Sequence, residues 1–452
     1  MKFCKYFIAA YLFLSVSFNS VFSQNERTVK IGVALPLFLE SGDNSKKQLG
    51  TEILNGIRFA LSQYSSSSPP LKVILEVLDT RRDPSLTREI ISGFAIDEDV
   101  IGVIGPVYSS EFSEILSIPE ENSLPVISPT ATGDNIAKDN YIYQLNPTYE
   151  VRGRLMADYL VRKMNMKNFA VMYESSYGIN FSKYFESHTN DLGCKILFSE
   201  SYSKEPESIR NVIAKLKKFI KEKDLFVNAS NLNITQRQKL ERAGVRSSLI
   251  DSSLSLNMDI SIYYIFGKNA RKILDTMNIK PSQLTNELKF IQGIIDAVYI
   301  PVSNSSDISI IVPQLYSESL GMFIAGTGDW NNEIVINDNR IYIRDLIFES
   351  EYYIDETSDW YREFKGELSK TKYKLSKNFL FGYDAMKLIL DLISDGSTTR
   401  SSLNDKLKNL TGYDATKSKI SLDYRGVNSE LNILRLGDGI TLSERYKLNI
   451  QD

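Results

Sequence analysis

The sequence is poor in the side chains from which most catalytic and metal centres are built. Its 452 residues include one histidine, His188, and two cysteines, Cys4 and Cys194. A serine triad, a zinc site of the Cys/His type and a disulfide framework are therefore nearly excluded. We expect no cofactor, a surface or packing role for His188, and a small buried hydrophobe in Cys194.

The chain also lacks an excess of positive charge. Lysine and arginine number 53 against 56 acidic residues, which gives a formal net charge of −3. This balance supplies no broad cationic surface, so we expect no nucleic-acid partner. No Gly-x-x-x-x-Gly-Lys loop or Gly-x-Ser-x-Gly elbow occurs, and Gly326-Thr327-Gly328 lacks the third glycine of a dinucleotide fingerprint. An enzyme is therefore the least favoured class of function.

Long apolar runs are confined to the N-terminus. Residues 1–23 have the pattern of a cleavable secretory signal peptide: Lys2 and Lys5 precede a mostly apolar stretch at 7–18, and Val21-Phe22-Ser23 suits a cleavage site. A membrane anchor is the alternative, but that stretch is short for a bilayer span. Cleavage removes two lysines, which takes the net charge from −3 to −5 and leaves Cys194 as the only thiol.

The first part of the mature chain alternates between short apolar strands and amphipathic helices. Strands are predicted at 29–37, 71–78, 100–106 and 122–129, and helices at 53–61 and 86–95. This rhythm is typical of a parallel sheet with helices on both faces.

The same rhythm restarts after Asn146-Pro147 and predicts a second α/β lobe. We expect a helix at 149–164 and strands at 168–173, 195–198, 296–301 and 322–326. Residues 205–292 are less regular, and we interpret them as an elaboration of the second lobe that contains a helix at 209–220 and a possible strand at 224–229. The tail from 419 to 440 alternates like a closing antiparallel ribbon.

Six segments carry a resemblance to a known family: Ile31-Gly32-Val33, Gly56-Ile57, Asp79-Thr80, Ile104 to Ser110, Pro125 to Thr132 and Tyr173 to Gly178. Their order and spacing resemble those of type I periplasmic binding proteins, in the leucine-binding-protein-like branch of branched-chain amino acid receptors that feed ABC transporters. No single segment is specific, but together they extend over most of the mature chain.

The resemblance implies an α/β fold of two Rossmann-like lobes with parallel sheets, joined by a three-strand hinge. Lobe 1 would comprise residues 24–147 plus about 351–418, and lobe 2 residues 148–350 plus about 419–452. It further implies a periplasmic protein that closes on a small amino-acid-like ligand and delivers it to an ABC permease. Ligands of open parallel sheets sit outside the carboxyl ends of the strands, where N–H groups are free.

In lobe 1 the resemblance places ligand contacts in two loops that follow strands. Tyr108, Ser109 and Ser110 would offer donors to a ligand carboxylate. Within the loop around Ala131, Thr130 would offer its carbonyl to an ammonium group, and Thr132 its hydroxyl and amide to the carboxylate. Taken alone, the residues favour a different interpretation, in which the serines cap a helix and Ser-Pro-Thr forms an ordinary turn.

In lobe 2 the resemblance implies an aromatic side chain at Tyr177 and an acid that pairs with the ammonium group. Asp329 is our candidate acid, with Trp330 as a possible wall of the cleft, although a turn with a packing Trp fits equally well. The resemblance also implies a second aromatic side chain in this lobe. Its position is occupied here by Ser303, or by Ser230 if the strand at 224–229 belongs to the main sheet. This departure argues against strict specificity for a branched aliphatic amino acid.

Two functions remain open at this point. The first is a solute-binding component of an ABC importer, which performs no catalysis. The second is a cell-envelope scaffold or regulator, similar to activators of penicillin-binding proteins, that keeps the fold and binds protein partners. The second predicts that residues 205–292 matter and that the cleft residues do not.

Overall fold

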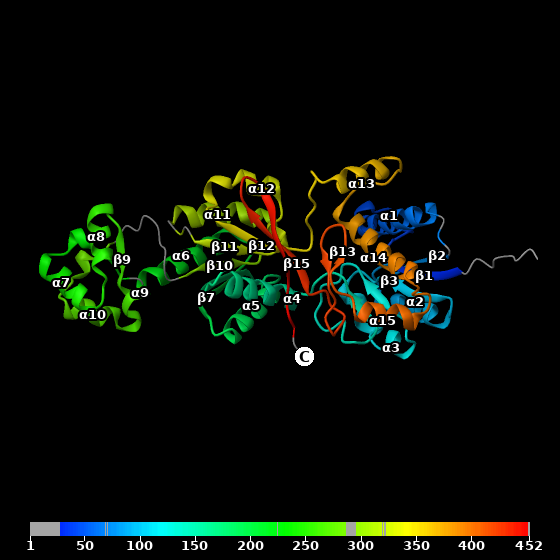
Figure 1. Cartoon of the computed structure of the whole chain (residues 1–452), viewed down its shortest axis with the longest axis horizontal. Coiled ribbons are helices and arrows are strands. Elements are labelled where there is room, and N and C mark those ends of the chain that lie inside the picture. The colour runs from blue at the N-terminus through cyan, green and yellow to red at the C-terminus, as the bar shows by residue number, and fades with distance from the viewer. Residues whose placement is uncertain are drawn as a thin grey trace, which may run out of the picture.

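The computed structural model describes residues 28–450 apart from positions 68, 70, 224, 286–294, 319 and 321, so the predicted signal peptide lies outside the described residues. The molecule is elongated, with one α/β lobe at one end, a second lobe in the middle and a smaller unit at the other end (Figure 1). None of the described helices is both long and apolar enough to cross a bilayer.

Lobe 1 is built on a five-stranded parallel sheet with the strand order β2-β1-β3-β4-β5. Its strands are β1 (Thr28–Leu35), β2 (Lys72–Asp79), β3 (Val100–Ile104), β4 (Val126–Ser128) and β5 (Ile142–Gln144). One face shares a core with α1 (Asn44–Ser66), α13 (Asp359–Ser369), α14 (Lys377–Ser394) and α15 (Arg400–Lys408). On the other face lies α2 (Pro84–Ile96), followed by the short α3 (Ile118–Glu121). The continuous burial of β3 explains its unbroken apolar run.

The core of lobe 1 joins segments from opposite ends of the chain. Helices α1 and α14 lie side by side (Figure 1), and two glycines allow their backbones to touch. A Cβ on Gly56 would lie 1.9 Å from the carbonyl oxygen of Phe379, and one on Gly382 would lie 2.0 Å from that of Ile53. Any side chain at either glycine would force the helices apart, because these neighbours are rigid backbone atoms.

Lobe 2 is built on a seven-stranded sheet with the strand order β16-β15-β12-β11-β10-β6-β7. Its strands are β6 (Asn168–Glu174), β7 (Lys195–Tyr202), β10 (Ala297–Ile300), β11 (Phe323–Gly326), β12 (Leu346–Ser350), β15 (Glu430–Leu436) and β16 (Ile440–Lys447). Helices α4 (Tyr149–Asp158) and α5 (Ile179–Asp191) cover one face, and α6 (Pro206–Lys223), α11 (Ile308–Ser317) and α12 (Glu333–Asp338) the other (Figure 1). The last two strands form the antiparallel ribbon that the tail predicts.

Residues 225–285 form a separate unit, which we call the distal unit. It contains β8 (Phe226–Asn228), α7 (Ile234–Ala243), α8 (Ser247–Leu256), β9 (Asp259–Ser261), α9 (Ile262–Phe266) and α10 (Ala270–Thr276). These elements enclose a hydrophobic core of their own, and β8 pairs only with β9 and Leu284 among the described residues. Helix α6 instead packs on the lobe 2 sheet, so the irregular stretch divides between two units.

The chain passes between the two lobes three times, after β5, after β12 and after the small hairpin of β13 (Tyr413–Asp414) and β14 (Lys419–Ile420). The crossings lie at about residues 145–148, 351–358 and 421–429. Two α/β lobes with parallel sheets joined in this way confirm the predicted fold class.

Candidate functional site

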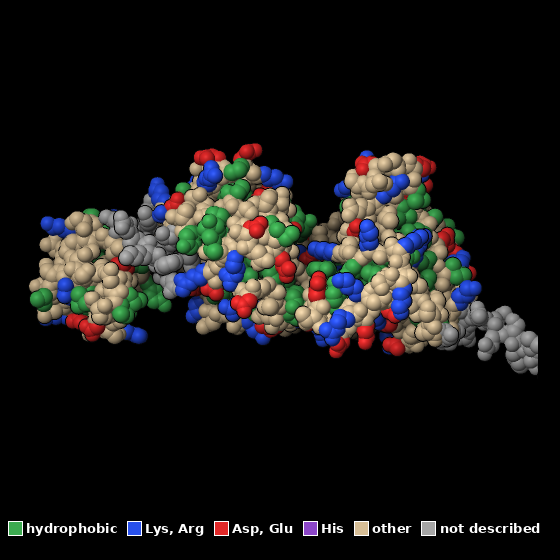
Figure 2. Space-filling model, turned by 90° about the horizontal axis from the view of Figure 1, so that it is seen from above, with side chains coloured by type: hydrophobic (Ala, Val, Ile, Leu, Met, Phe, Trp, Pro, Cys, Tyr) green, Lys and Arg blue, Asp and Glu red, His purple; other side chains and the backbone are tan. Residues whose placement is uncertain are grey.

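The candidate site lies where the carboxyl ends of the parallel strands of the two lobes face each other. The surface is hollowed between the lobes (Figure 2). Loops that follow β3 and β4 belong to the lobe 1 side, and loops that follow β6, β10 and β11 belong to the lobe 2 side. The carboxyl edge of a parallel sheet is where open α/β folds bind ligands.

On the lobe 1 side, two loops are tied together by hydrogen bonds. Gly105 directly follows β3 and has a φ of +103°, and a Cβ there would lie 2.0 Å from the carbonyl oxygen of Ala34, so only glycine fits. The Thr130 hydroxyl then donates to the Val107 carbonyl at 2.8 Å, and the Gly133 N–H donates to the Ser109 hydroxyl oxygen at 2.9 Å. The predicted carboxylate-binding loops are therefore held next to each other.

The predicted lobe 1 residues differ in what they present to the cleft. Ser110 is exposed and Thr132 is half-buried, and the hydroxyl of Thr132 has no partner among the described residues. Ala131 is buried, and its N–H and carbonyl are engaged by Ser128 at 3.2 Å and by Gln144 at 3.0 Å. Ala131 therefore supports the loop and offers no free donor to a ligand.

The carbonyl of Thr130 is already in use. It accepts a hydrogen bond of 3.2 Å from the side-chain amide of Asn146, at the first crossing between the lobes. A carbonyl oxygen has two lone pairs, so it can still accept a second hydrogen bond from an ammonium group.

Arg82 is a cation at this edge that sequence reasoning missed. It follows β2, and its guanidinium carbon lies 4.1 Å from the centre of the Tyr108 ring. This geometry is a cation–π contact, and it places a fixed positive charge beside the lobe 1 donors. The signal was the run Asp79-Thr80-Arg81-Arg82, because loops after parallel strands reach the ligand edge of the sheet.

On the lobe 2 side, the structure brings Tyr177 and Asp329 together. The Tyr177 hydroxyl donates to a carboxylate oxygen of Asp329 at 3.2 Å, although the loops after β6 and β11 supply them separately. Burial raises the pKa of Asp329, while Arg152, Lys377 and the Tyr177 hydroxyl oppose that increase. Burial and the nearby Asp329 also raise the pKa of Tyr177, so its hydroxyl keeps its proton and acts as a donor.

Two other predicted residues take different places. Trp330 is fully buried in the lobe 2 core, and its indole N–H donates to the carbonyl of Ile300 at 2.8 Å. It therefore packs beneath the site, in contrast to the expected cleft wall. Ser303 is half-buried and follows β10, the strand between β6 and β11, whereas Ser230 lies in the distal unit. The register that uses Ser303 is the one the sheet adopts.

Behind Asp329 lies a network of buried charges that the sequence analysis did not identify. Arg152 on α4 forms an ion pair with Glu351, and Lys377 from lobe 1 pairs with the same carboxylate. A carboxylate oxygen of Glu349 lies 3.6 Å from the Arg152 guanidinium. The alternation of acids in Phe348-Glu349-Ser350-Glu351 at the end of an apolar strand was the available signal.

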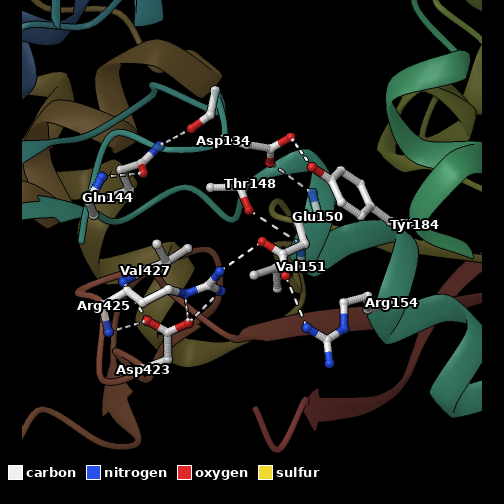
Figure 3. Close-up of polar contacts among 12 residues, drawn as sticks. Asp134, Gln144, Thr148, Glu150, Val151, Arg154, Tyr184, Asp423, Arg425 and Val427 are labelled. Carbon is white, nitrogen blue, oxygen red and sulfur yellow. Dashed lines mark hydrogen bonds and ion pairs between the residues drawn. The ribbon is translucent and has the colours of Figure 1, made fainter. Parts of the chain in front are cut away.

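A second polar network connects the lobes near the crossings (Figure 3). Asp134 in lobe 1 accepts hydrogen bonds from the Tyr184 hydroxyl at 2.8 Å and from the Glu150 N–H at 3.1 Å, both in lobe 2. Arg425, in the third crossing, contacts Glu150 at 2.7 Å and Asp423 at 2.8 Å. These contacts tie the first and third crossings together at the base of the lobes.

The histidine and the described cysteine of the chain lie away from the cleft loops. Among the described residues, no three His, Cys, Asp or Glu side chains lie so as to hold a metal ion. His188 packs in lobe 2, where its Nε2 lies 3.3 Å from a carboxylate oxygen of Asp158. Cys194 is a half-buried free thiol that packs against an apolar cluster.

Comparisons with known proteins support the family and the fold. Residues 52–389 match the family model described as "Receptor family ligand binding region". The fold is similar to that of a putative branched-chain amino acid ABC transporter protein from Rhodospirillum rubrum, at 15% identity, with a TM-score of 0.63 and coverage of 90% of this chain and 97% of that one. A comparison with curated protein sequences finds no match.

Two further solved structures were determined with ligands. An ABC transporter substrate-binding protein from Desulfitobacterium hafniense in complex with Leu shares 14% identity, with a TM-score of 0.54 and coverage of 92% and 100%. A solute-binding protein from R. palustris in complex with 4-hydroxybenzoate shares 12% identity, with a TM-score of 0.55 and coverage of 93% and 97%. Similarity at this level of identity shows the fold alone.

Proposed function

Because the chain belongs to the receptor ligand-binding-region family and has the fold of type I periplasmic binding proteins, we propose that it is an extracytoplasmic solute-binding protein. It captures a small amino-acid-like zwitterion between its lobes and delivers it to an ABC permease. In this role the protein performs no catalysis, and it acts in the periplasm.

The observation that carries the proposal is the pairing of Tyr177 with Asp329 opposite the lobe 1 donors. A carboxylate set beside a phenol is suited to an ammonium group, while Ser110, Thr132 and Arg82 on the other lobe are suited to a carboxylate. A ligand with both groups would bridge the cleft and favour its closure. Ala131 and Trp330 take no direct part, because both are buried.

Thermal-shift measurements on the mature chain test the proposal. Amino acids and aromatic acids are screened individually, and a true ligand at about 100 times its dissociation constant adds about 2.7 kcal/mol of stability. We expect Asp329→Asn to abolish the shift produced by an amino acid. The matched control is Asp338→Asn, because Asp338 is exposed at the end of α12. A screen without any amino acid ligand would contradict the proposal.

A second candidate function is supported by the distal unit. This unit has its own hydrophobic core, and six of the large exposed apolar side chains lie on it: Ile234, Leu249, Leu254, Leu256, Met258 and Tyr264. Apolar side chains in that position are suited to a protein partner in the cell envelope. If this is the main function, deletion of residues 225–285 abolishes activity in cells and Asp329→Asn leaves it intact.

A further inference from the structure

Glu349 is a buried carboxylate without the partners that such a group normally has. It lies in β12 with 0% of its surface exposed. Neither carboxylate oxygen has a hydrogen bond of normal geometry to any described residue. Buried carboxylates are almost always paired or hydrogen-bonded, because removing a charge from water is costly.

Among the described residues, Arg152 is the cation that lies beside Glu349, and it is committed to a different acid. Arg152 forms its close ion pair with Glu351, whereas its contact with Glu349 is 3.6 Å long. Lys377 reaches the network from lobe 1, but it also pairs with Glu351. Glu351 therefore has two cations and is stable as an anion, and Glu349 shares one of them at a longer distance.

The groups around Glu349 come from several elements. Arg152 approaches from α4, Glu351 comes directly after the strand that holds Glu349, and Asp329 lies in the turn after β11. Tyr299 on β10 presents a hydroxyl that also has no described partner. Burial, Glu351 and Asp329 raise the pKa of Glu349 to about 7, while Arg152 and the Gly328 N–H oppose the increase. Near neutral pH, both protonation states of this carboxyl are therefore populated.

The network lies directly behind the proposed ligand contact. A Cβ on Gly328, the residue before Asp329, would lie 2.8 Å from a carboxylate oxygen of Glu351 and 3.5 Å from the Arg152 guanidinium. A positive charge bound at Asp329 therefore adds a cation to a group of three acids and two bases. That added charge favours the ionised form of Glu349.

We propose that Glu349 carries an exchangeable proton and releases it when a cationic headgroup binds at Asp329. This inference rests on the function proposed above, and it adds a regulatory property to the same site. Ligands with an ammonium group then bind more tightly as the pH rises from 6 to 8, by up to about tenfold for each unit by which the pKa falls. A ligand without an ammonium group releases no proton.

The first arm of the test uses the ligand-free mature protein. Infrared difference spectra between pH 5.5 and 8.5, with 13C-labelled glutamate, are expected to show a protonated glutamate that ionises near neutral pH. Glu349→Gln removes this signal. The matched control is Glu430→Gln, since Glu430 is also a buried glutamate of this sheet but accepts a hydrogen bond of 2.6 Å from Ser421. If no glutamate ionises near neutral pH, the proposal is overturned, whatever the protein binds.

The second arm uses calorimetry with L-leucine as the probe and 4-hydroxybenzoate as the probe without an ammonium group. Titrations at pH 7 in two buffers of different ionisation enthalpy are expected to show release of about half a proton per leucine. Glu349→Gln removes the release and keeps the binding. Leucine binding without buffer dependence overturns the coupling. Absence of leucine binding with the infrared signal intact overturns the coupling for this probe, whereas the proposed function falls only if the screen finds no amino acid ligand at all. Should Glu349→Gln fail to fold, the wild-type measurements in both arms decide.

Discussion

The hydroxyl of Tyr184 in lobe 2 donates a hydrogen bond of 2.8 Å to Asp134 in lobe 1. This bond joins the lobes directly, outside the three covalent crossings. Removing the hydroxyl oxygen of this one side chain would therefore change how firmly the two lobes are held together.

Replacing Tyr184 with Phe keeps the ring and removes this hydrogen bond. A hydrogen bond to a charged group contributes about 1.5–3 kcal/mol, so we expect the variant to populate more open arrangements of the lobes. Small-angle X-ray scattering would detect this as a larger radius of gyration. The control is Tyr446→Phe, which loses a hydrogen bond to Asp158 within lobe 2. Equal changes in the two variants would count against an inter-lobe role.

Replacing Tyr177 with Phe tests the cleft pair. The variant loses the donor that orients Asp329, and we expect the affinity for an amino acid to fall by about three- to tenfold, as for one hydrogen bond of about 1 kcal/mol. Because the two side chains act as a unit, their effects in Tyr177→Phe, Asp329→Asn and the double variant should not add. Additive losses in calorimetric titrations would show that the pair does not act together.

The two tryptophans of the chain test whether Trp330 is part of the core beneath the candidate site. Trp330 is 0% exposed and holds the Ile300 carbonyl, whereas Trp360 is 40% exposed and stacks on Phe364. We expect Trp330→Phe to lower the free energy of unfolding by about 2–4 kcal/mol, through lost packing and an unpaired carbonyl. Trp360→Phe should cost less than about 1 kcal/mol. Denaturant unfolding compares them, and similar losses would contradict the assignment of Trp330 to the core.

The pH dependence of stability has a definite sign. The pKa of Glu349 is about 7 in the folded protein and 4.5 in its unperturbed state, so the folded state binds the proton more tightly. The contribution of this group to stability is full below pH 4.5 and is lost as the pH rises to 7. The total loss is about 3 kcal/mol. Relative to Glu349→Gln, the wild type should therefore become less stable between pH 5 and 8 in urea unfolding. Parallel pH profiles of the two proteins would exclude a raised pKa.

The sequence predicts the lobes well because their signals are local. The apolar run of β3 and the face of α1 follow from periodicity alone, and Asn146-Pro147 marks the first crossing. The boundary of the distal unit was harder to predict from the sequence. The apolar stripe of α6 predicts a helix, but the stripe does not indicate whether it covers the lobe 2 sheet or a separate core.

The candidate site was harder to predict because its geometry depends on distant contacts. Trp330 follows a turn, and nothing local shows that its indole lies over Gly326, where a Cβ would come within 2.3 Å of the ring. The network of Arg152, Glu349 and Glu351 depends on a helix and a strand that are far apart in the chain. Tyr177 and Asp329 were placed by resemblance, and their hydrogen bond becomes visible only in the folded structure.

The packing of α1 against α14 has a consequence for the order of events during synthesis. Lobe 1 begins with the first described residues, but α14, the main packing partner of α1, comes only at residues 377–394. At about 5–20 residues per second, the ribosome takes roughly 15 to 60 s to get from the end of α1 to the start of α14. Throughout that interval β1 can pair with β2 and β3, but α1 lacks α14 and the core on this face of the sheet stays open. Under the proposed export of this chain, the delay leaves the face of α1 that packs on α14 uncovered while the leading segment crosses the membrane.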